Sequence, residues 1–163
     1  MLVAVLSDIH DNISHLLTAL ALAEERGCRH LFVTGDIATL STLRTLREEW
    51  EYEIDLVFGN NEWNRAEHLR LAEQFHHCRH HGDTADFSLD GRHILLTHYP
   101  QVAEQALQRG GYDAIFYGHT HKAELRVGRH GIIANPGEID GVRNAPSFAV
   151  YDTANNSLTF CRV

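Results

Sequence analysis

Short apolar runs and helix-like patterns alternate along the first half of the chain. An uninterrupted apolar run such as residues 2–6 is typical of a buried strand. Between such runs, apolar residues recur every three or four positions, as at Ile13, Leu16 and Leu20, which is typical of one face of a helix. The pattern predicts strands over residues 2–6, 31–34 and 54–58 and helices over residues 12–26, 41–49 and 65–75. This order of strands and helices favours parallel pairing.

The second half of the chain predicts mainly antiparallel pairing. Apolar runs at 87–89 and 93–97 flank Asp90-Gly91, a dipeptide that is typical of a hairpin turn. A helix is expected over residues 101–109. Further strands are expected over residues 114–117, 124–127, 132–134, 148–151 and 158–161, separated by Gly or Asn turns. The two halves together predict a mixed α/β layered fold in a single domain over residues 1–163.

Composition narrows the class of protein. The chain has 14 basic and 22 acidic residues, a net charge of −8, which makes nucleic acid an unfavoured partner. A metal site that binds one phosphate stays open, because the metals bring their own positive charge. The three cysteines are odd in number and widely spaced, so we expect a reduced, cytoplasmic protein. The sequence has neither a signal-peptide pattern nor an apolar stretch that could cross a membrane.

Polar side chains follow the most apolar strands at the point where each strand ends. Ligands of open α/β sheets bind outside the carboxyl ends of the strands, so these side chains are expected to converge if the strands share a sheet. The seven candidates are Asp8, His10, Asp36, Asn60, His98, His119 and His121. Each alone would pass for an ordinary turn residue, but five strand ends with the same chemistry favour a shared site.

The seven side chains together indicate divalent metals. Carboxylate, imidazole and amide oxygen ligands suit Mn²⁺, Fe²⁺, Zn²⁺, Co²⁺ or Ni²⁺ better than Ca²⁺. Seven ligands are too many for one such ion and fit two ions that share a carboxylate. The sequence therefore predicts two divalent cations at one edge of the fold.

The order of these motifs resembles that of the calcineurin-like metallophosphoesterases. The motifs are Asp-x-His, Gly-Asp, Gly-Asn-x-Glu, a single His and Gly-His-x-His, and they span most of the chain. The short length and the closing Asn135-Pro136-Gly137 resemble the small bacterial and archaeal phosphodiesterase branch. The resemblance implies a four-layer αββα sandwich of two mixed β-sheets flanked by helices. It also implies hydrolysis of a small phosphate ester by in-line attack of a metal-bound hydroxide.

The same resemblance distributes the ligands between two metals. Asp8, His10, Asp36 and His121 would hold the first metal. Asp36, Asn60, His98 and His119 would hold the second, with Asp36 bridging. Manganese is the expected metal, with nickel, zinc, iron, cobalt or magnesium as alternatives. His98 is expected to be a catalytic residue as well as a ligand.

Three positions depart from the family pattern. Asn61 stands where many members have the histidine that protonates the leaving group, so it is expected instead to hydrogen-bond a phosphate oxygen as a catalytic and substrate-binding residue. Tyr99 stands where members of this branch often have glycine, and it is expected to bind the substrate. Glu138 replaces a common serine, which bears on substrate preference, whereas Glu62 is expected to orient its neighbours. We expect phosphodiesters and activated aryl esters to be favoured over alkyl monoesters.

Two other functions stay open. One family branch, the retromer scaffold subunit, keeps the fold but has lost part of the metal site, so a non-catalytic scaffold is the alternative. Here all seven positions hold coordinating side chains, which favours an enzyme. A nuclease acting on DNA is less favoured because the chain is acidic. The late hairpins could offer an edge for an oligomer.

Several conspicuous residues are expected to lie outside the site. The histidine-rich tract 76–81 is not expected to bind a native metal. Trp50 and Trp63 are expected to be packing anchors, with Trp63 the better candidate for a wall of the site. Arg65 is interpreted as a surface arginine. Surface or turn positions are expected for His15, His68, His93 and His130.

Overall fold

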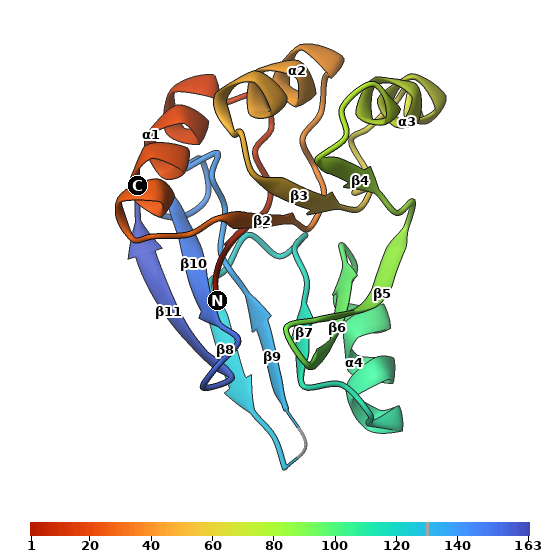
Figure 1. The fold of residues 1–163 in the computed structure, drawn as a ribbon, viewed down its shortest axis with the longest axis vertical. Coiled ribbons are helices and arrows are strands. Elements are labelled where there is room, and N and C mark those ends of the chain that lie inside the picture. The colour runs from red at the N-terminus through yellow and green to blue at the C-terminus, as the bar shows by residue number, and fades with distance from the viewer. Residues whose placement is uncertain (130) are drawn as a thin grey trace.

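The computed structural model describes residues 1–129 and 131–163, and His130 lies outside them. Within these residues the chain forms two β-sheets flanked by helices (Figure 1). The first sheet has the order β11-β10-β1-β2-β3-β4. Its strands are β1 (Leu2–Leu6), β2 (His30–Val33), β3 (Glu53–Leu56), β4 (Cys78–His80), β10 (Ser147–Asp152) and β11 (Ser157–Arg162). As the sequence predicts, β1, β2 and β3 pair in parallel.

The second sheet has the order β5-β6-β7-β9-β8. Its strands are β5 (Thr84–Leu89), β6 (Arg92–Thr97), β7 (Ala114–Phe116), β8 (Glu124–Val127) and β9 (Ile132–Asn135). The expected hairpin joins β5 to β6. The prediction of antiparallel pairing in the second half is wrong for β6, β7 and β9, which are parallel. The helix α4 (Pro100–Arg109) returns the chain to the start of the sheet between β6 and β7, and β8, antiparallel to β9, does so between β7 and β9.

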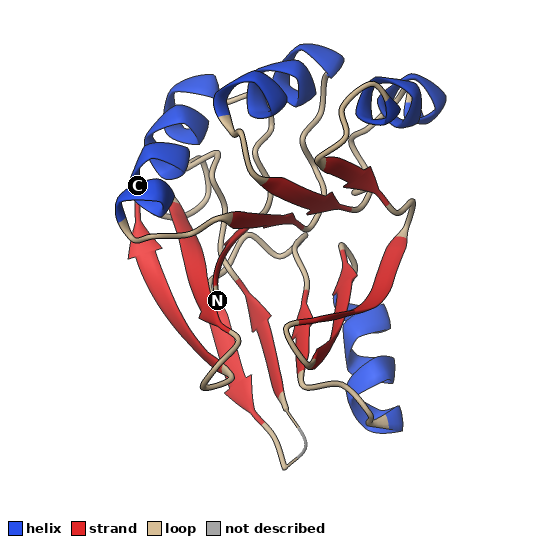
Figure 2. Cartoon of the chain, viewed as in Figure 1, coloured by secondary structure: helices blue, strands red, loops and turns tan. Residues whose placement is uncertain are grey.

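Three apolar cores separate four layers (Figure 2). Alternation along β1 sends Ala4 and Leu6 toward α1 (Ile13–Glu25) and α2 (Leu40–Glu49), whereas Val3 and Val5 face the second sheet. The helix α3 (Arg65–Glu73) covers the same face as α1 and α2. The outer face of the second sheet packs against α4. The expected four-layer αββα sandwich is confirmed.

One strand has no counterpart among the expected elements. The strand β4 lies inside the histidine-rich tract and pairs in parallel with β3. Only Cys78 of its three residues is buried, so the tract carries no apolar run that would indicate a strand. Tertiary pairing with β3 determines its conformation.

Two of the packing expectations are wrong. Trp50 is fully buried, as expected of a packing anchor, but the side chain of Trp63 is 86% exposed. A surface position is also wrong for His68, which lies on α3 and is buried against the ring of Phe58. In both cases the direction of the side chain depends on the loops that follow β2 and β3, which the local pattern does not determine.

Candidate metal centre

All seven strand-end side chains lie together. They come from both sheets, because the carboxyl ends of β1, β2 and β3 meet those of β6 and β7. The strands do not all share one sheet; the side chains converge because the two expected sheets meet at a common edge. The backbone N–H of His119 donates to Asp8 Oδ2 over 3.1 Å, although the two residues are 111 positions apart.

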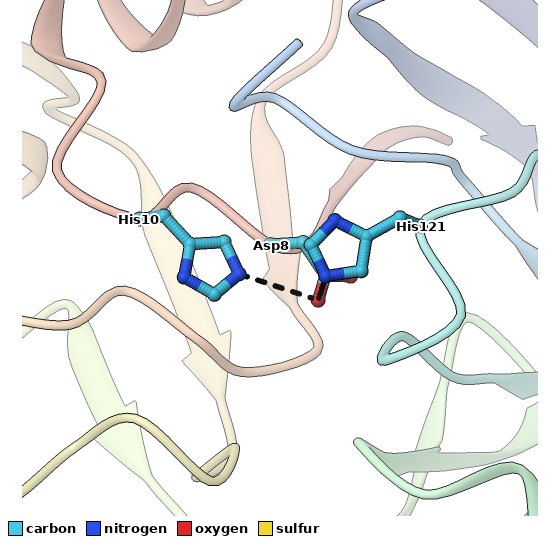
Figure 3. A group of neighbouring side chains, drawn as sticks. All are labelled: Asp8, His10 and His121. Atoms are coloured by element: carbon cyan, nitrogen blue, oxygen red, sulfur yellow. Dashed lines mark ion pairs between the residues drawn. The ribbon is translucent and has the colours of Figure 1, made fainter. Parts of the chain in front are cut away.

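Asp8, His10 and His121 form the first half of the centre (Figure 3). Asp8 Oδ1 lies 3.4 Å from His121 Nε2 and 3.8 Å from His10 Nε2. The two imidazole rings stack with centroids 5.1 Å apart and an interplanar angle of 13°. Three donor atoms from the loops that follow β1 and β7 thus face one small volume.

Asp36, Asn60, His98 and His119 form the second half. Asn60 Oδ1 lies 3.1 Å from His98 Nε2 and 2.9 Å from His119 Nδ1. Asp36 Oδ2 lies 3.5 Å from His98 Nε2 and 3.4 Å from His10 Nε2. The Asp36 carboxylate therefore stands between the two halves.

The backbone is unusual at five of the seven residues. Asp8, His10, Asp36, His119 and His121 all have a positive φ, between 45° and 70°. Asp and His enter this left-handed region more often than most residues, but each instance still carries conformational strain. Strain gathered at one set of strand ends is typical of a functional site.

Two buried atoms of the centre lack partners. Asp8 Oδ1 and His10 Nε2 have no hydrogen-bond partner anywhere in residues 1–129 and 131–163. A buried polar atom without a partner is costly, and a cation that accepts its lone pair removes that cost. The donor set of carboxylates, imidazoles and one amide oxygen suits divalent transition metals, so these residues fit the group that the family pattern implies.

Three hydrogen bonds and the neighbouring His98 determine the charge of the Asp36 carboxyl. Its Oδ1 accepts from the backbone N–H groups of Asn60 and Asn61, and its Oδ2 accepts from Asn61 Nδ2 over 2.8 Å. Burial alone would raise the pKa of the Asp36 carboxyl, but His98 and the Asn61 donors together hold that pKa well below its usual range. Asp36 is therefore ionised at neutral pH.

The histidines are oriented by hydrogen bonds outside the centre. His98 Nδ1 donates to the carbonyl oxygen of Thr34 over 2.8 Å, so the lone pair of the neutral ring lies on Nε2, which faces the centre. Burial lowers the pKa of His98, but the Asp36 carboxylate raises it overall, so a proton and a cation compete for Nε2. The pKa of His119 is lowered mainly by burial and to a smaller extent by the neighbouring His98. The lower pKa favours the neutral ring, which is the form that binds a metal.

Glu138 is part of the centre, although the sequence pattern marked it only as a departure. Its Oε2 lies 2.5 Å from His121 Nδ1, and its Oε1 accepts from the backbone N–H groups of Arg143 and Asn144. The side chain of Glu138 is fully buried, so it does not influence substrate preference by direct contact with a substrate. Its position beside a histidine ligand depends on the packing of the loop after β9.

Glu62 and two glycines hold the loops together. Glu62 accepts from Ile37 N over 2.6 Å and from Gly59 N over 2.8 Å, so the geometry agrees with its expected orienting role. A Cβ at Gly59 would lie 2.1 Å from Asp36 Oδ1, and one at Gly118 would lie 2.0 Å from Ser7 Oγ. Only glycine permits the backbone to approach this closely.

The remaining candidates lie around the centre. The Asn61 amide contacts Asp36, and the Tyr99 ring lies 5.2 Å from that of His98 and 5.7 Å from that of His119. Arg65 donates to Asp83 and to the carbonyl oxygen of Gly59. The histidine-rich tract lies at the edge of the first sheet, where His81 contacts the buried Asp55.

Known proteins resemble the chain over most of its length. Residues 1–156 match the calcineurin-like phosphoesterase superfamily domain. Phosphodiesterase MJ0936 of Methanocaldococcus jannaschii is 24% identical over 94% of this chain and 93% of its own length. A solved archaeal phosphodiesterase has a TM-score of 0.89 at 23% identity, with full coverage of both chains.

Two further solved structures share the fold at lower identity. The phosphoesterase YfcE of E. coli has a TM-score of 0.73 at 19% identity, with full coverage of both chains. A single mutant of Vps29 from Entamoeba histolytica has a TM-score of 0.69 at 19% identity, over 100% of this chain and 98% of its own. Among the described residues, none of the helices is long and apolar enough to cross a membrane. From the match over residues 1–156, the chain belongs to the calcineurin-like phosphoesterase superfamily, a class of metal-dependent hydrolases of phosphate esters.

Proposed function

We propose that this chain is a phosphodiesterase that depends on two divalent cations and acts through one catalytic domain over residues 1–163. The observation that carries the proposal is the position of Asp36, whose Oδ2 lies 3.4 Å from His10 Nε2 and 3.5 Å from His98 Nε2. One carboxylate oxygen thus stands between two groups of donors. That is the arrangement in which a carboxylate bridges two cations.

The donors divide into two sets. Asp8, His10, Asp36 and His121 would hold one cation. Asp36, Asn60, His98 and His119 would hold the other. Mn²⁺ is the first candidate, with Ni²⁺, Zn²⁺, Fe²⁺, Co²⁺ or Mg²⁺ as alternatives. The donor set mixes imidazole nitrogens with carboxylate and amide oxygens, which suits such divalent metals.

Bound divalent cations supply positive charge that attracts a phosphate and favours deprotonation of an attacking water near neutral pH. The chain contributes the geometry. Asp8 and Asp36 neutralise only half of the charge of two divalent ions, so the centre keeps an attraction for an anionic ester. The strained backbone and the contacts of Glu62 hold the donors in place before a substrate arrives.

The identity of residue 61 supports a diester substrate. A carboxamide cannot protonate a poor leaving group, whereas the family histidine could, so good leaving groups are favoured. The amide of Asn61 donates to Asp36, and the rest of that side chain is part-exposed beside the centre, where it would reach a phosphate oxygen. The relative from M. jannaschii is itself named a phosphodiesterase.

Small phosphate esters are the proposed substrates, in the cytoplasm. The net charge of −8 disfavours long nucleic acids. The three cysteines are buried free thiols, which fits a reducing compartment. The alternative function is a metal-binding scaffold, supported by the likeness of the fold to Vps29. The complete set of seven donors favours catalysis.

The test is hydrolysis of bis(p-nitrophenyl) phosphate by metal-stripped protein with Mn²⁺, Ni²⁺, Zn²⁺, Mg²⁺ or buffer added. Metal-dependent turnover is expected in the wild type and in His76→Ala, an exposed histidine outside the centre. Turnover should be lost in Asp36→Asn and in His119→Ala. Tight binding of two cations without turnover on this or other diesters would favour the scaffold.

A further inference from the structure

A cavity of about 300 Å³ lies between the chain segments that follow Asp36 and Asn61. We call it the Trp63 pocket; its wall includes Ala38, Thr39, Leu40, Ser41, Trp63 and His68. The wall is built from the loops that lead from β2 to α2 and from β3 to α3, together with the first turns of those two helices. A volume of this size is at the lower end of the range for small-molecule sites.

The same two loops carry two of the residues of the candidate metal centre, Asp36 and Asn60. Ala38 follows Asp36 by two positions, and Trp63 follows Asn61 by two positions. Two residues of extended chain span at most about 7 Å, so both walls of the pocket begin within that reach of the centre. A substrate whose phosphate lies at Asp36 and Asn61 can therefore extend a neighbouring group into the pocket.

The pocket offers an aromatic face and little charge. The Trp63 side chain is 86% exposed, the highest value among the exposed large apolar residues that the structure describes. An exposed indole has no packing role and provides a rigid surface for stacking. The described wall residues include no Lys, Arg, Asp or Glu, which disfavours a second phosphate and favours an uncharged planar ring.

One buried polar atom in the wall is unpaired, Nε2 of His68. His68 is 1% exposed, and its Nδ1 donates to the carbonyl oxygen of Asn64 over 3.1 Å. The lone pair of the neutral ring then lies on Nε2, which has no hydrogen-bond partner among the described residues. A buried acceptor without a partner suits an N–H donor brought by a ligand.

The starts of α2 and α3 add donors. The side chains of their N-cap residues, Thr39 and Asn64, make no capping hydrogen bond to the first turn of either helix. In α3 the N–H of Glu67 donates to the carbonyl oxygen of Asn64, so the first-turn N–H groups before it, with those of α2, are left for other acceptors. Both N-caps line the pocket, so it can offer N–H groups to carbonyl oxygens as well as an acceptor to an N–H.

We propose that the Trp63 pocket binds a nucleobase-like ring of the substrate, a planar uncharged ring with both an N–H and a carbonyl group. The ring stacks on Trp63, and its N–H donates to His68 Nε2. The enzyme then acts on nucleoside phosphodiesters in preference to esters without a ring. This inference rests on the proposed function for the place of the phosphate.

The test compares two ligands that differ only in the base, thymidine 5′-monophosphate and 2-deoxyribose 5-phosphate. Their dissociation constants are measured by titration calorimetry on metal-loaded protein. The wild type should bind the nucleotide about tenfold more tightly. Trp63→Ala should remove most of that difference, Trp63→Phe should retain it, and Val127→Ala, an exposed apolar residue on β8, should leave it unchanged.

His68→Phe provides a second, independent arm. The substitution keeps a buried ring but removes the acceptor. The affinity for the nucleotide should therefore fall, whereas the affinity for the sugar phosphate should not change. Thermal unfolding by circular dichroism checks that each variant folds. An affinity gap that persists in Trp63→Ala would overturn the proposal, as would equal affinities in the wild type.

The failure of the pocket and the failure of the proposed function are distinguishable. Turnover of bis(p-nitrophenyl) phosphate with no affinity gap overturns the pocket alone. An affinity difference that depends on Trp63, without turnover of any diester, supports ring binding in the Trp63 pocket and overturns the proposed phosphodiesterase activity. A change in sedimentation mass on Trp63→Ala with unchanged affinities would assign Trp63 to a contact between copies and overturn the proposal.

Discussion

Glu138 Oε2 lies 2.5 Å from Nδ1 of His121, and both side chains are buried beside the candidate metal centre. A carboxylate only accepts, so Nδ1 carries the proton and Nε2 presents its lone pair toward Asp8. Arg143 N and Asn144 N hold the other oxygen of Glu138 in place. The carboxylate thereby determines both the tautomer and the orientation of the ring.

Glu138→Gln should weaken metal binding. The amide that replaces one carboxylate oxygen can place an N–H against Nδ1, and the tautomer is no longer determined. The loss of such an outer partner is expected to cost about 10- to 100-fold in affinity for Mn²⁺, measured by titration calorimetry on apoprotein. Glu124→Gln, at a partly exposed carboxylate on β8, is the matched control. Equal affinities in the two variants would contradict a positioning role.

Gly59→Ala should disrupt the centre through Asp36. The added Cβ would lie 2.1 Å from Asp36 Oδ1 and 2.5 Å from Asp36 N, so the carboxylate or its loop must move. We expect loss of the second bound metal, measured by metal analysis after dialysis, together with a lower Tm. Gly128→Ala is the control, because its nearest atom is 3.4 Å away. Retention of two metals by Gly59→Ala would show that the loop adapts.

Asn61→His should widen the range of leaving groups. A histidine restores a group that can protonate a poor leaving group, an effect worth about 10²-fold or more. The ratio of kcat/KM for an alkyl p-nitrophenyl diester to that for a dialkyl diester should therefore fall. The effect on the p-nitrophenyl ester itself should be small, since that leaving group needs no proton. An unchanged ratio would mean that residue 61 does not limit the leaving group.

Acid should destabilise the fold through His80. Burial, with a smaller contribution from His68, lowers the pKa of His80 from 6.5 to about 3. The unfolded state therefore binds the proton first, whereas above pH 6.5 His80 is neutral in both states and causes no loss of stability. Stability is lost as the pH falls from 6.5 toward 3, at up to about 1.4 kcal/mol per pH unit.

His80→Gln removes this titration and keeps an acceptor for Gly82 N. Urea unfolding of apoprotein between pH 4 and 8 should show a shallower loss of stability in the variant than in the wild type. Parallel curves for the two proteins would mean that His80 is protonated in the folded state. His76→Ala, at an exposed histidine of the same tract, should follow the wild-type curve.

The metal-centre residues could be identified from sequence because their placement depends on local rules. A buried strand ends where a Gly, Asp, Asn or His turn begins, and the direction of parallel strands brings such ends to one edge. Asp8, Asp36 and His98 follow these rules, and the structure brings them together. That two sheets share the edge is a tertiary fact, since no local pattern states which strands pair.

The sequence by itself determined the order of most strands and helices and marked the seven candidate donors. Hydrophobic periodicity and turn chemistry act over a few residues, so one chain displays them without its fold. Only the tertiary structure decided that β4 is a strand, that Glu138 stands behind His121 and that Trp63 is exposed beside His68. Each depends on contacts between distant segments, whose energies come from pairing and burial that no short window of sequence contains.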